Sequence, residues 1–211
     1  MIRQATYEDL KKIAAVHISC FPKSFSTALG KGNGGYLLEK FYKEYMDVVP
    51  ELFLVAVDEN HSDDIVGFAM GYYCEKNNYQ NDFFKHNFLQ IFMRIVLLLC
   101  CGNLSAWKKV TSVLKKSVAP EIKDEQYLSY PSSRKGDLLS ICILPEYRGT
   151  GMSSALIEAF ENVLRDQGRE FIQLTVEMDN PRGISFYDKM GYMTYRVVAN
   201  KKQGMYKRLH I

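Results

Sequence analysis

A glycine-rich turn between a predicted strand and a predicted helix is the strongest chemical feature of this sequence. The apolar run Leu138 to Leu144 ends at Pro145, and the segment Arg148 to Ser154 then carries glycines at 149 and 151. Glycines let a backbone approach a ligand closely, and the first turn of a helix offers unpaired N–H groups at its positive end. The combination predicts a cradle for a pyrophosphate group.

The turn alone is weak evidence for phosphate binding. It lacks the Lys-Ser/Thr pair of a P-loop and the complete glycine pattern of a dinucleotide-binding fold. A tight strand-to-helix turn without any ligand is the plain alternative. The elements around the turn must therefore decide between the two.

Periodicity predicts alternating strands and helices around this turn. The strands are expected at 1–6, 52–57, 65–73, 138–144, 171–176, 191–198 and 205–209, and the helices at 6–20, 36–48, 153–165 and 182–190. A loop is expected at 21–35. Residues 78–136 differ in composition from the rest of the chain. They comprise an apolar segment expected to be helical at 88–101, a basic amphipathic segment at 107–116 and a polar linker at 121–135.

Composition excludes several classes of protein. The chain has 211 residues, 47% of them hydrophobic, which suits a single globular domain over 1–211. A net charge of +3 gives no reason to expect nucleic acid binding. Five cysteines without a CxxC pair argue against disulfides and a metal site, and favour a reducing cytoplasm. No signal peptide is recognised, and no apolar run reaches the ~20 residues of a membrane span.

Two motifs resemble the signatures of the GNAT superfamily of N-acetyltransferases. Arg148-x-x-Gly151-x-Ser153, preceded by Ile143-x-Pro145, resembles the acyl-CoA loop R/Q-x-x-G-x-G/A. The segment from Asn180 to Tyr192 is similar to the second signature, N-x-x-A-x-x-x-Y-x-x-x-G-F. The resemblance covers 136–195 closely and 1–75 in pattern only. Its departures are the residues Ser153, Gly183 and Tyr192.

The resemblance implies an α+β fold of three layers with a mixed, mostly antiparallel sheet splayed at its central strand. A helical insertion, 78–136, would lie between the third and fourth strands. The cosubstrate implied is acetyl-CoA or another short acyl-CoA, without a metal. The residues expected to bind it are Ile141, Cys142, Ile143, Arg148, Gly149, Thr150, Gly151, Met152, Ser153, Ser154 and Asn180.

The resemblance also assigns the chemistry. Tyr187 would protonate the leaving thiolate as a general acid, with aromatic packing as its alternative role. Asp137 stands at the position where the histone-modifying branch of the superfamily has a glutamate that acts as the general base. Strand alternation is expected to place Asp137 on the same face of the strand as Ile141. A solvated strand-end acid is the alternative, and Glu177 and His17 are the other candidate bases. Cys142 is expected on the opposite face as a small buried hydrophobe, not a nucleophile.

The acceptor is expected at the loop between the first two helices. Its candidate contacts are Ser24, Phe25, Ser26, Thr27 and Glu177. The stretch from His17 to Phe25, with the insertion, is loosely similar to a GNAT branch associated with bacterial surface-polysaccharide genes, which implies a small-molecule amine such as a nucleotide-linked amino sugar. A protein N-terminal acetyltransferase of the ribosomal-protein alanine type and a non-catalytic acyl-CoA-binding module remain as alternatives.

The insertion has two candidate roles besides covering the sheet or cleft. Its apolar run is a candidate surface for a homodimer or for peripheral contact with a membrane. Its lysines at 108–116 fit a solvated helix face better than a nucleic-acid patch.

Overall fold

The computed structural model describes residues 1–30, 35–59, 64–76, 83, 85–102, 120–198 and 201–210. Within them, eight strands form one sheet in the order β1-β2-β3-β5-β6-β8-β7-β4. Only β5 and β6 pair in parallel, and all other neighbours are antiparallel. The strands are β1 Ile2–Gln4, β2 Phe53–Asp58, β3 Asp64–Tyr73, β4 Glu121–Ile122, β5 Lys135–Ile143, β6 Phe171–Glu177, β7 Met193–Val198 and β8 Lys202–Arg208.

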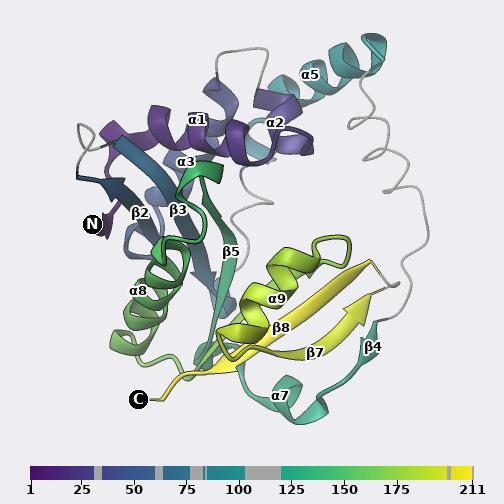
Figure 1. The fold of residues 1–211 in the computed structure, drawn as a ribbon. Coiled ribbons are helices and arrows are strands. Elements are labelled where there is room, and N and C mark those ends of the chain that lie inside the picture. The colour runs from purple at the N-terminus through teal and green to yellow at the C-terminus, as the bar shows by residue number, and fades with distance from the viewer. Residues whose placement is uncertain are drawn as a thin grey trace.

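Helices cover both faces of this sheet, as Figure 1 shows. On one face, α1 and α3 pack on the first strands, where the His17 ring stacks on Phe68 and Tyr42 contacts Phe53. On the other face lie α8 and α9, with α9 in front of β7 and β8 in Figure 1. The helices are α1 Leu10–Cys20, α2 Phe25–Gly30, α3 Tyr36–Met46, α5 Phe88–Cys100, α7 Glu125–Ser129, α8 Met152–Asp166 and α9 Pro181–Lys189.

Helix α8 lies very close to the sheet because two glycines face it. A Cβ on Gly71 of β3 would stand 2.4 Å from the Phe160 ring, and one on Gly136 of β5 would stand 2.4 Å from Leu164. Phe160 and Leu164 are both fully buried. Because glycine has no side chain, α8 packs directly against the backbone of β3 and β5 at these two positions.

A buried carboxylate joins α8 to the second half of the sheet. Glu161 is 1% exposed, and its oxygens accept from Lys207 Nζ of β8 at 2.8 and 3.0 Å. They also accept from the Tyr192 hydroxyl at 3.0 Å and from Arg165 Nη2 at 3.2 Å. The two cations and the hydroxyl satisfy a charge that burial would otherwise destabilise.

The predicted α+β fold with a mostly antiparallel sheet is confirmed, and two segments predicted to lack secondary structure are corrected. The expected loop at 21–35 contains α2, and the expected linker at 121–135 contains β4 and α7. Asp124 caps α7 by accepting from Tyr127 N at 2.8 Å, and the Tyr127 ring stacks on Tyr206 with centroids 3.9 Å apart. The five residues of α7 are too few to show helical periodicity in the sequence.

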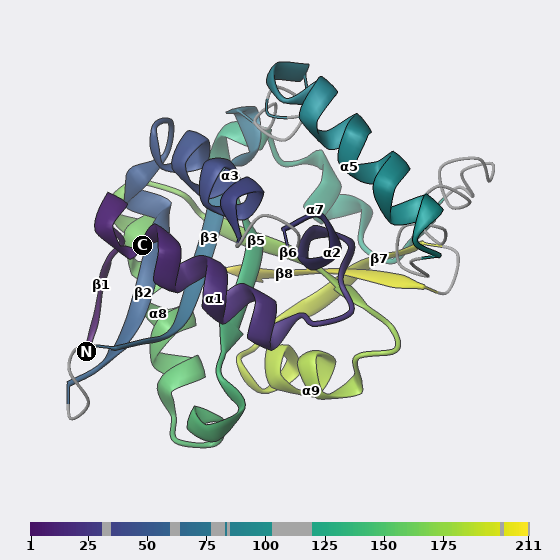
Figure 2. The same ribbon diagram turned by 90° about the horizontal axis from the view of Figure 1, so that it is seen from above.

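The insertion is described in part. Its apolar run forms α5, at the outer edge of the molecule beside α2 (Figures 1 and 2). The basic piece expected at 107–116 lies outside the described residues. Among the described helices, none combines the length and apolar character needed to traverse a bilayer.

Candidate functional site

The sheet opens between its two parallel strands. Residues Lys135–Leu138 of β5 pair with Phe171–Leu174 of β6, and the pairing stops there although both strands continue. Beyond Leu138, β5 remains bonded to β3 on its other side. The last part of β5 therefore presents backbone groups to an opening rather than to a neighbouring strand, as the predicted splay requires.

A bulge in β5 coincides with this opening. Gly71 of β3 pairs with Leu138 while the next residue, Met70, pairs with Ser140, so Leu139 is the extra residue. A bulge bends the strand and increases its twist. The local distortion explains why β5 and β6 diverge at this point.

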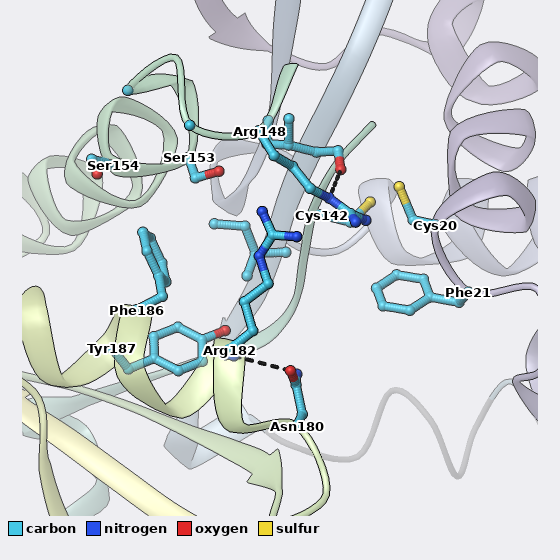
Figure 3. A pocket seen from close by; sticks show the side chains of 15 residues that line it. Cys20, Phe21, Cys142, Arg148, Ser153, Ser154, Asn180, Arg182, Phe186 and Tyr187 are labelled. Carbon is cyan, nitrogen blue, oxygen red and sulfur yellow. Dashed lines mark hydrogen bonds between the residues drawn. The ribbon is translucent and has the colours of Figure 1, made fainter. Parts of the chain in front are cut away.

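A cavity of about 620 Å³ lies at the opening. The end of α1, the end of β5, the following loop and α9 all contribute to it, as Figure 3 shows. Its lining residues are Cys20, Phe21, Ile141, Cys142, Ile143, Arg148, Gly149, Gly151, Ser153, Ser154, Asn180, Arg182, Gly183, Phe186 and Tyr187. The predicted strand, turn and second motif thus meet in one place.

The glycine-rich loop presents the start of α8 to this cavity. Gly149 and Gly151 have φ values of +81° and +86°, and a Cβ on either would meet no atom within 4 Å. The first helical bond of this turn runs from Ala155 N to Gly151 O, so the N–H groups of 151–154 have no intrahelical acceptor. Open space beside unpaired donors at a helix start is an anion-binding arrangement.

Tyr187 of α9 and the residue that caps this helix, Asn180, face the same space. The Tyr187 hydroxyl points into the cavity in Figure 3, and burial raises its pKa to about 12, so the phenol stays protonated at neutral pH. Asn180 lines the cavity as the N-cap of α9, with its Oδ1 accepting from Gly183 N at 2.9 Å. The site therefore places backbone N–H groups without intrahelical acceptors and a protonated phenol around one cavity.

Comparison with known proteins agrees with this architecture. Residues 120–192, which carry β5, the loop, α8, β6 and all of α9, match the family model described as the acetyltransferase (GNAT) family. This core of the chain is thus similar to the GNAT superfamily.

Individual relatives match the same core. N-alpha-acetyltransferase 30 of Schizosaccharomyces pombe is 34% identical over 62 residues, covering 29% of this chain and 41% of that protein. An N-alpha-acetyltransferase of Saccharolobus solfataricus is 35% identical over 66 residues, covering 31% and 40%. The matches thus span about two fifths of these curated relatives.

A solved structure shares the fold over the whole chain. The PaiA N-acetyltransferase from Thermoplasma acidophilum in complex with coenzyme A has a TM-score of 0.56 and 16% identity. The alignment covers 99% of this chain and 98% of that one. At this identity the similarity establishes the fold alone.

Most residues expected to bind the cofactor lie together. Nine of the eleven line the cavity, and the two that do not are Thr150 and Met152. The Thr150 hydroxyl donates to Tyr147 O at 2.7 Å, and the Met152 side chain packs against the core. Arg148 Nε donates to Ile143 O at 3.2 Å, so its side chain folds back over the end of β5 (Figure 3).

The expected face of Asp137 is wrong because of the bulge. In the observed register Asp137 lies opposite Tyr72 and Cys142 opposite Phe68, whereas Ile141 lies opposite Ala69. Asp137 therefore shares the face of Cys142, since the extra residue Leu139 breaks simple alternation. Its carboxylate does not line the cavity.

The surroundings of Asp137 are polar but largely buried. Its Oδ2 accepts from Gln173 Nε2 at 2.7 Å, and Gln173 Oε1 accepts from the Tyr127 hydroxyl at 2.7 Å. Burial raises the pKa of the Asp137 carboxyl to about 6, although the hydrogen bond from Gln173 lowers it. The group can thus change protonation near neutral pH.

The residues expected at the acceptor lie outside the cavity lining. Ser24 and Ser26 Oγ atoms are 3.0 Å apart, and Thr27 is buried, with its backbone N–H donating to Ser24 Oγ. Glu177 is exposed and pairs with Lys202 at 3.1 Å. The side chain of Phe25 lies outside the described residues.

His17 is a packing residue, as its position on an apolar helix predicts. Its Nδ1 lies 2.6 Å from the Tyr42 hydroxyl and its Nε2 lies 2.9 Å from Ser26 Oγ. Burial lowers its pKa to about 4, which keeps the ring neutral.

Several residues of the cavity lining are not among those expected from the sequence. Arg182, in the first turn of α9, projects its guanidinium into the centre of Figure 3, and a cation directly after Asn180 and Pro181 was a readable signal. Cys20 and Phe21 come from the end of α1, which only the fold brings to β5. The Cys20 thiol contacts that of Cys142, whose pKa is raised by burial. A buried, protonated Cys142 agrees with its exclusion as a nucleophile.

Proposed function

We propose that this chain is an acetyl-CoA-dependent N-acetyltransferase whose acceptor is the α-amino group of a protein N-terminus. The opening between β5 and β6, with the loop 148–154 on one wall and Tyr187 on another, carries the proposal. The cavity suits a nucleotide diphosphate with a long arm because backbone donors, Arg148 and Arg182 surround open space.

In this proposal some residues bind the cosubstrate and others transfer protons. The N–H groups of 151–154 and the guanidinium of Arg182 would hold phosphate, and the unpaired edge of β5 would hold the amide-bearing arm. Acetyl-CoA supplies a thioester whose acyl carbon a neutral amine can attack. Tyr187 would give its proton to the departing sulfur, which a pKa of about 12 keeps available at neutral pH.

Asp137 is the proposed proton acceptor for the attacking amine. Its pKa of about 6 is nearer neutrality than an ordinary carboxyl, which makes it a better base. His17 has both ring nitrogens engaged and a pKa of about 4, and Glu177 is tied to Lys202 at the surface. Because Asp137 lies outside the cavity lining, the proton would reach it through an intervening group or water.

The acceptor assignment rests on the relatives. The two N-alpha-acetyltransferases match a stretch about as long as the family core, and their names point to α-amino groups. The amino-sugar expectation rests on the stretch 17–25, of which Cys20 and Phe21 line the cavity. The relatives favour the protein N-terminus.

A thiol-release assay with paired acceptors tests the proposal. Purified protein and acetyl-CoA are incubated with short peptides, with the same peptides N-formylated, and with nucleotide-linked amino sugars. We expect release of CoA with the free peptides and none with the formylated ones, because formylation removes the nucleophile. Turnover of amino sugars alone would overturn the assignment of the acceptor. Binding of acetyl-CoA without release of CoA for any amine would indicate a non-catalytic acyl-CoA-binding module.

A further inference from the structure

Two cysteine thiols face each other at one wall of the cavity. Cys20 is the last residue of α1, and Cys142 lies near the end of β5. Both line the cavity, and Figure 3 shows their sulfur atoms directed toward each other. Neither is part of a disulfide. The cavity therefore holds a pair of adjacent thiols that the proposed reaction does not use.

The packing of α1 on the sheet explains why these thiols meet. The His17 ring stacks on Phe68 of β3 with centroids 6.3 Å apart, and Phe68 lies opposite Cys142 in the register of β3 and β5. Opposite residues of neighbouring strands share a face of the sheet, and residues three apart share a side of a helix. Cys20, three residues after His17, is therefore placed over Cys142 as His17 is placed over Phe68.

The two thiols differ in acidity. The hydrogen bond with Cys142 and the positive charge of Arg148 lower the pKa of the Cys20 thiol, although burial and the charge of Glu146 oppose them. Arg148 is held in place because its Nε donates to Ile143 O at 3.2 Å. Burial raises the pKa of the Cys142 thiol. Cys20 therefore supplies the more reactive thiolate of the pair, and Cys142 stays protonated beside it.

We propose that Cys20 and Cys142 form an oxidation site, at which a peroxide such as hydrogen peroxide produces an intramolecular disulfide. The Cys20 thiolate attacks one peroxide oxygen, the O–O bond breaks, and hydroxide leaves a sulfenic acid on Cys20. The Cys142 sulfur then attacks the Cys20 sulfur and displaces the hydroxyl group, which leaves as water with the proton of Cys142. The thiols lose two electrons and the peroxide gains them. Proximity makes the second step intramolecular, which offsets the weak acidity of Cys142.

The disulfide changes the cavity because its two sulfur atoms belong to different walls. An S–S bond of about 2 Å is shorter than any non-bonded contact, so it draws the end of α1 toward the end of β5. The backbone of β5 from Ile141 to Ile143 is the edge proposed to hold the arm of acetyl-CoA. This effect on binding rests on the proposed function, whereas formation of the disulfide does not. We expect the oxidised protein to bind acetyl-CoA roughly tenfold or more weakly.

Peptide mapping by mass spectrometry tests the oxidation site. The reduced full chain is treated with hydrogen peroxide, the remaining thiols are alkylated, and the protein is digested. We expect a disulfide that joins the peptides of Cys20 and Cys142. Alkylated Cys20 and Cys142 after the exposed Cys100 and Cys101 have reacted, or Cys20 oxidised without a partner, would overturn the proposal.

Serine variants separate this pair from another thiol. Cys142→Ser should leave Cys20 as a sulfenic acid that a dimedone probe captures, because no second thiol resolves it. Cys74→Ser is the matched control, since Cys74 follows Tyr73, which pairs with Gly136 at the other end of β5. In this control the Cys20–Cys142 disulfide should form as in the wild-type protein. Equal loss of the disulfide in a Cys74→Ser variant would contradict the assignment of the pair.

Thermal melts with and without acetyl-CoA test the effect on binding. Acetyl-CoA should protect the reduced protein, protect the disulfide-linked protein less, and protect it fully again after dithiothreitol. In Cys20→Ser, peroxide should not change the protection. Equal protection of the reduced and the disulfide-linked protein would overturn the effect on the cavity. Absence of protection in the reduced protein would instead contradict the proposed function, and the peptide map would still decide the oxidation site.

Discussion

The donor end and the expected acceptor end of the proposed reaction are built in different ways. At the donor end, a loop and a helix adjacent in sequence present backbone N–H groups to a cavity, and Gly149 and Gly151 leave that space open. At the other end, Ser24, Ser26 and His17 contact one another, and Thr27 is buried. One region is arranged to receive a ligand, whereas the other has already paired its polar groups within the fold.

The contrast shows which binding residues can be predicted from sequence and which can be found only from the fold. The donor end depends on local backbone geometry, which a short motif specifies. The acceptor end depends on which side chains the fold brings together, as with Cys20 and Phe21 at the end of α1. Variants at the two ends should therefore differ in the size of their effect on turnover, with the larger losses at the donor end.

The largest effect is expected at the loop. Gly151→Val should abolish thermal protection by acetyl-CoA and leave under about 1% of turnover, because a β-branched residue resists φ of +86° and fills the open space. Thermal melts with and without acetyl-CoA measure this. Gly168→Val is the matched control, since Gly168 has φ of +68° and open space but lies at the far end of α8. Equal loss of protection in both variants would indicate general destabilisation.

The next effect concerns the proton donor. Tyr187→Phe should lower turnover by roughly 10²–10⁴ with acetyl-CoA affinity nearly unchanged, because the ring keeps its packing while the hydroxyl is lost. Tyr192→Phe should do the reverse, lowering the free energy of unfolding by about 1–2 kcal/mol through the bond to Glu161 while sparing turnover. Wild-type turnover in Tyr187→Phe, with chemistry rate-limiting, would return Tyr187 to a packing role.

A smaller and pH-dependent effect is expected at Asp137. Asp137→Asn should lower turnover most between about pH 6, above which the wild-type carboxylate is ionised, and the pKa of the amine; a higher pH should partly rescue it because the amine then deprotonates in solution. A pH profile of kcat/KM measures this. A defect that does not vary with pH would remove Asp137 as the base.

The Asp137→Asn substitution that lowers turnover should raise the free energy of unfolding at neutral pH. The pKa of Asp137 is raised from 3.8 to about 6, so the folded state binds the proton more tightly than the unfolded chain. Wild-type stability therefore falls as pH rises through this window, and Asp137→Asn should gain roughly 1–3 kcal/mol at pH 7 and nothing below about pH 4. Chemical denaturation at the two pH values checks the sign.

The smallest effect is expected at the surface. Glu177→Gln removes an exposed ion pair with Lys202 and should change stability by under about 1 kcal/mol and turnover by under about twofold. A large loss of turnover with a shifted pH profile would make Glu177 the base instead of Asp137.

The sequence predicts the parts of the fold that depend on local pattern. The strand before Pro145, the glycine turn and α8 follow from alternation, φ requirements and helical periodicity, and all three are found. The face of Asp137 could not be predicted, because one extra residue at Leu139 reverses the alternation and nothing in the strand's composition marks it. The sequence shows a cation at Arg182 within the second motif, but whether its side chain points into the cavity depends on how α9 packs on the sheet.

The cluster around Glu161 has a consequence for the width of the cavity. The two half-sheets share only the short pairing of Lys135–Leu138 with Phe171–Leu174, whereas α8 contacts both of them. Phe160 and Leu164 fix the helix to β3 and β5, and Glu161 fixes it to β8. The separation of the half-sheets is therefore set by one helix acting as a spacer. A substitution that breaks the contact between Glu161 and Lys207 would therefore change the width of the cavity, and with it the fit of a bound ligand, although neither residue lines the cavity.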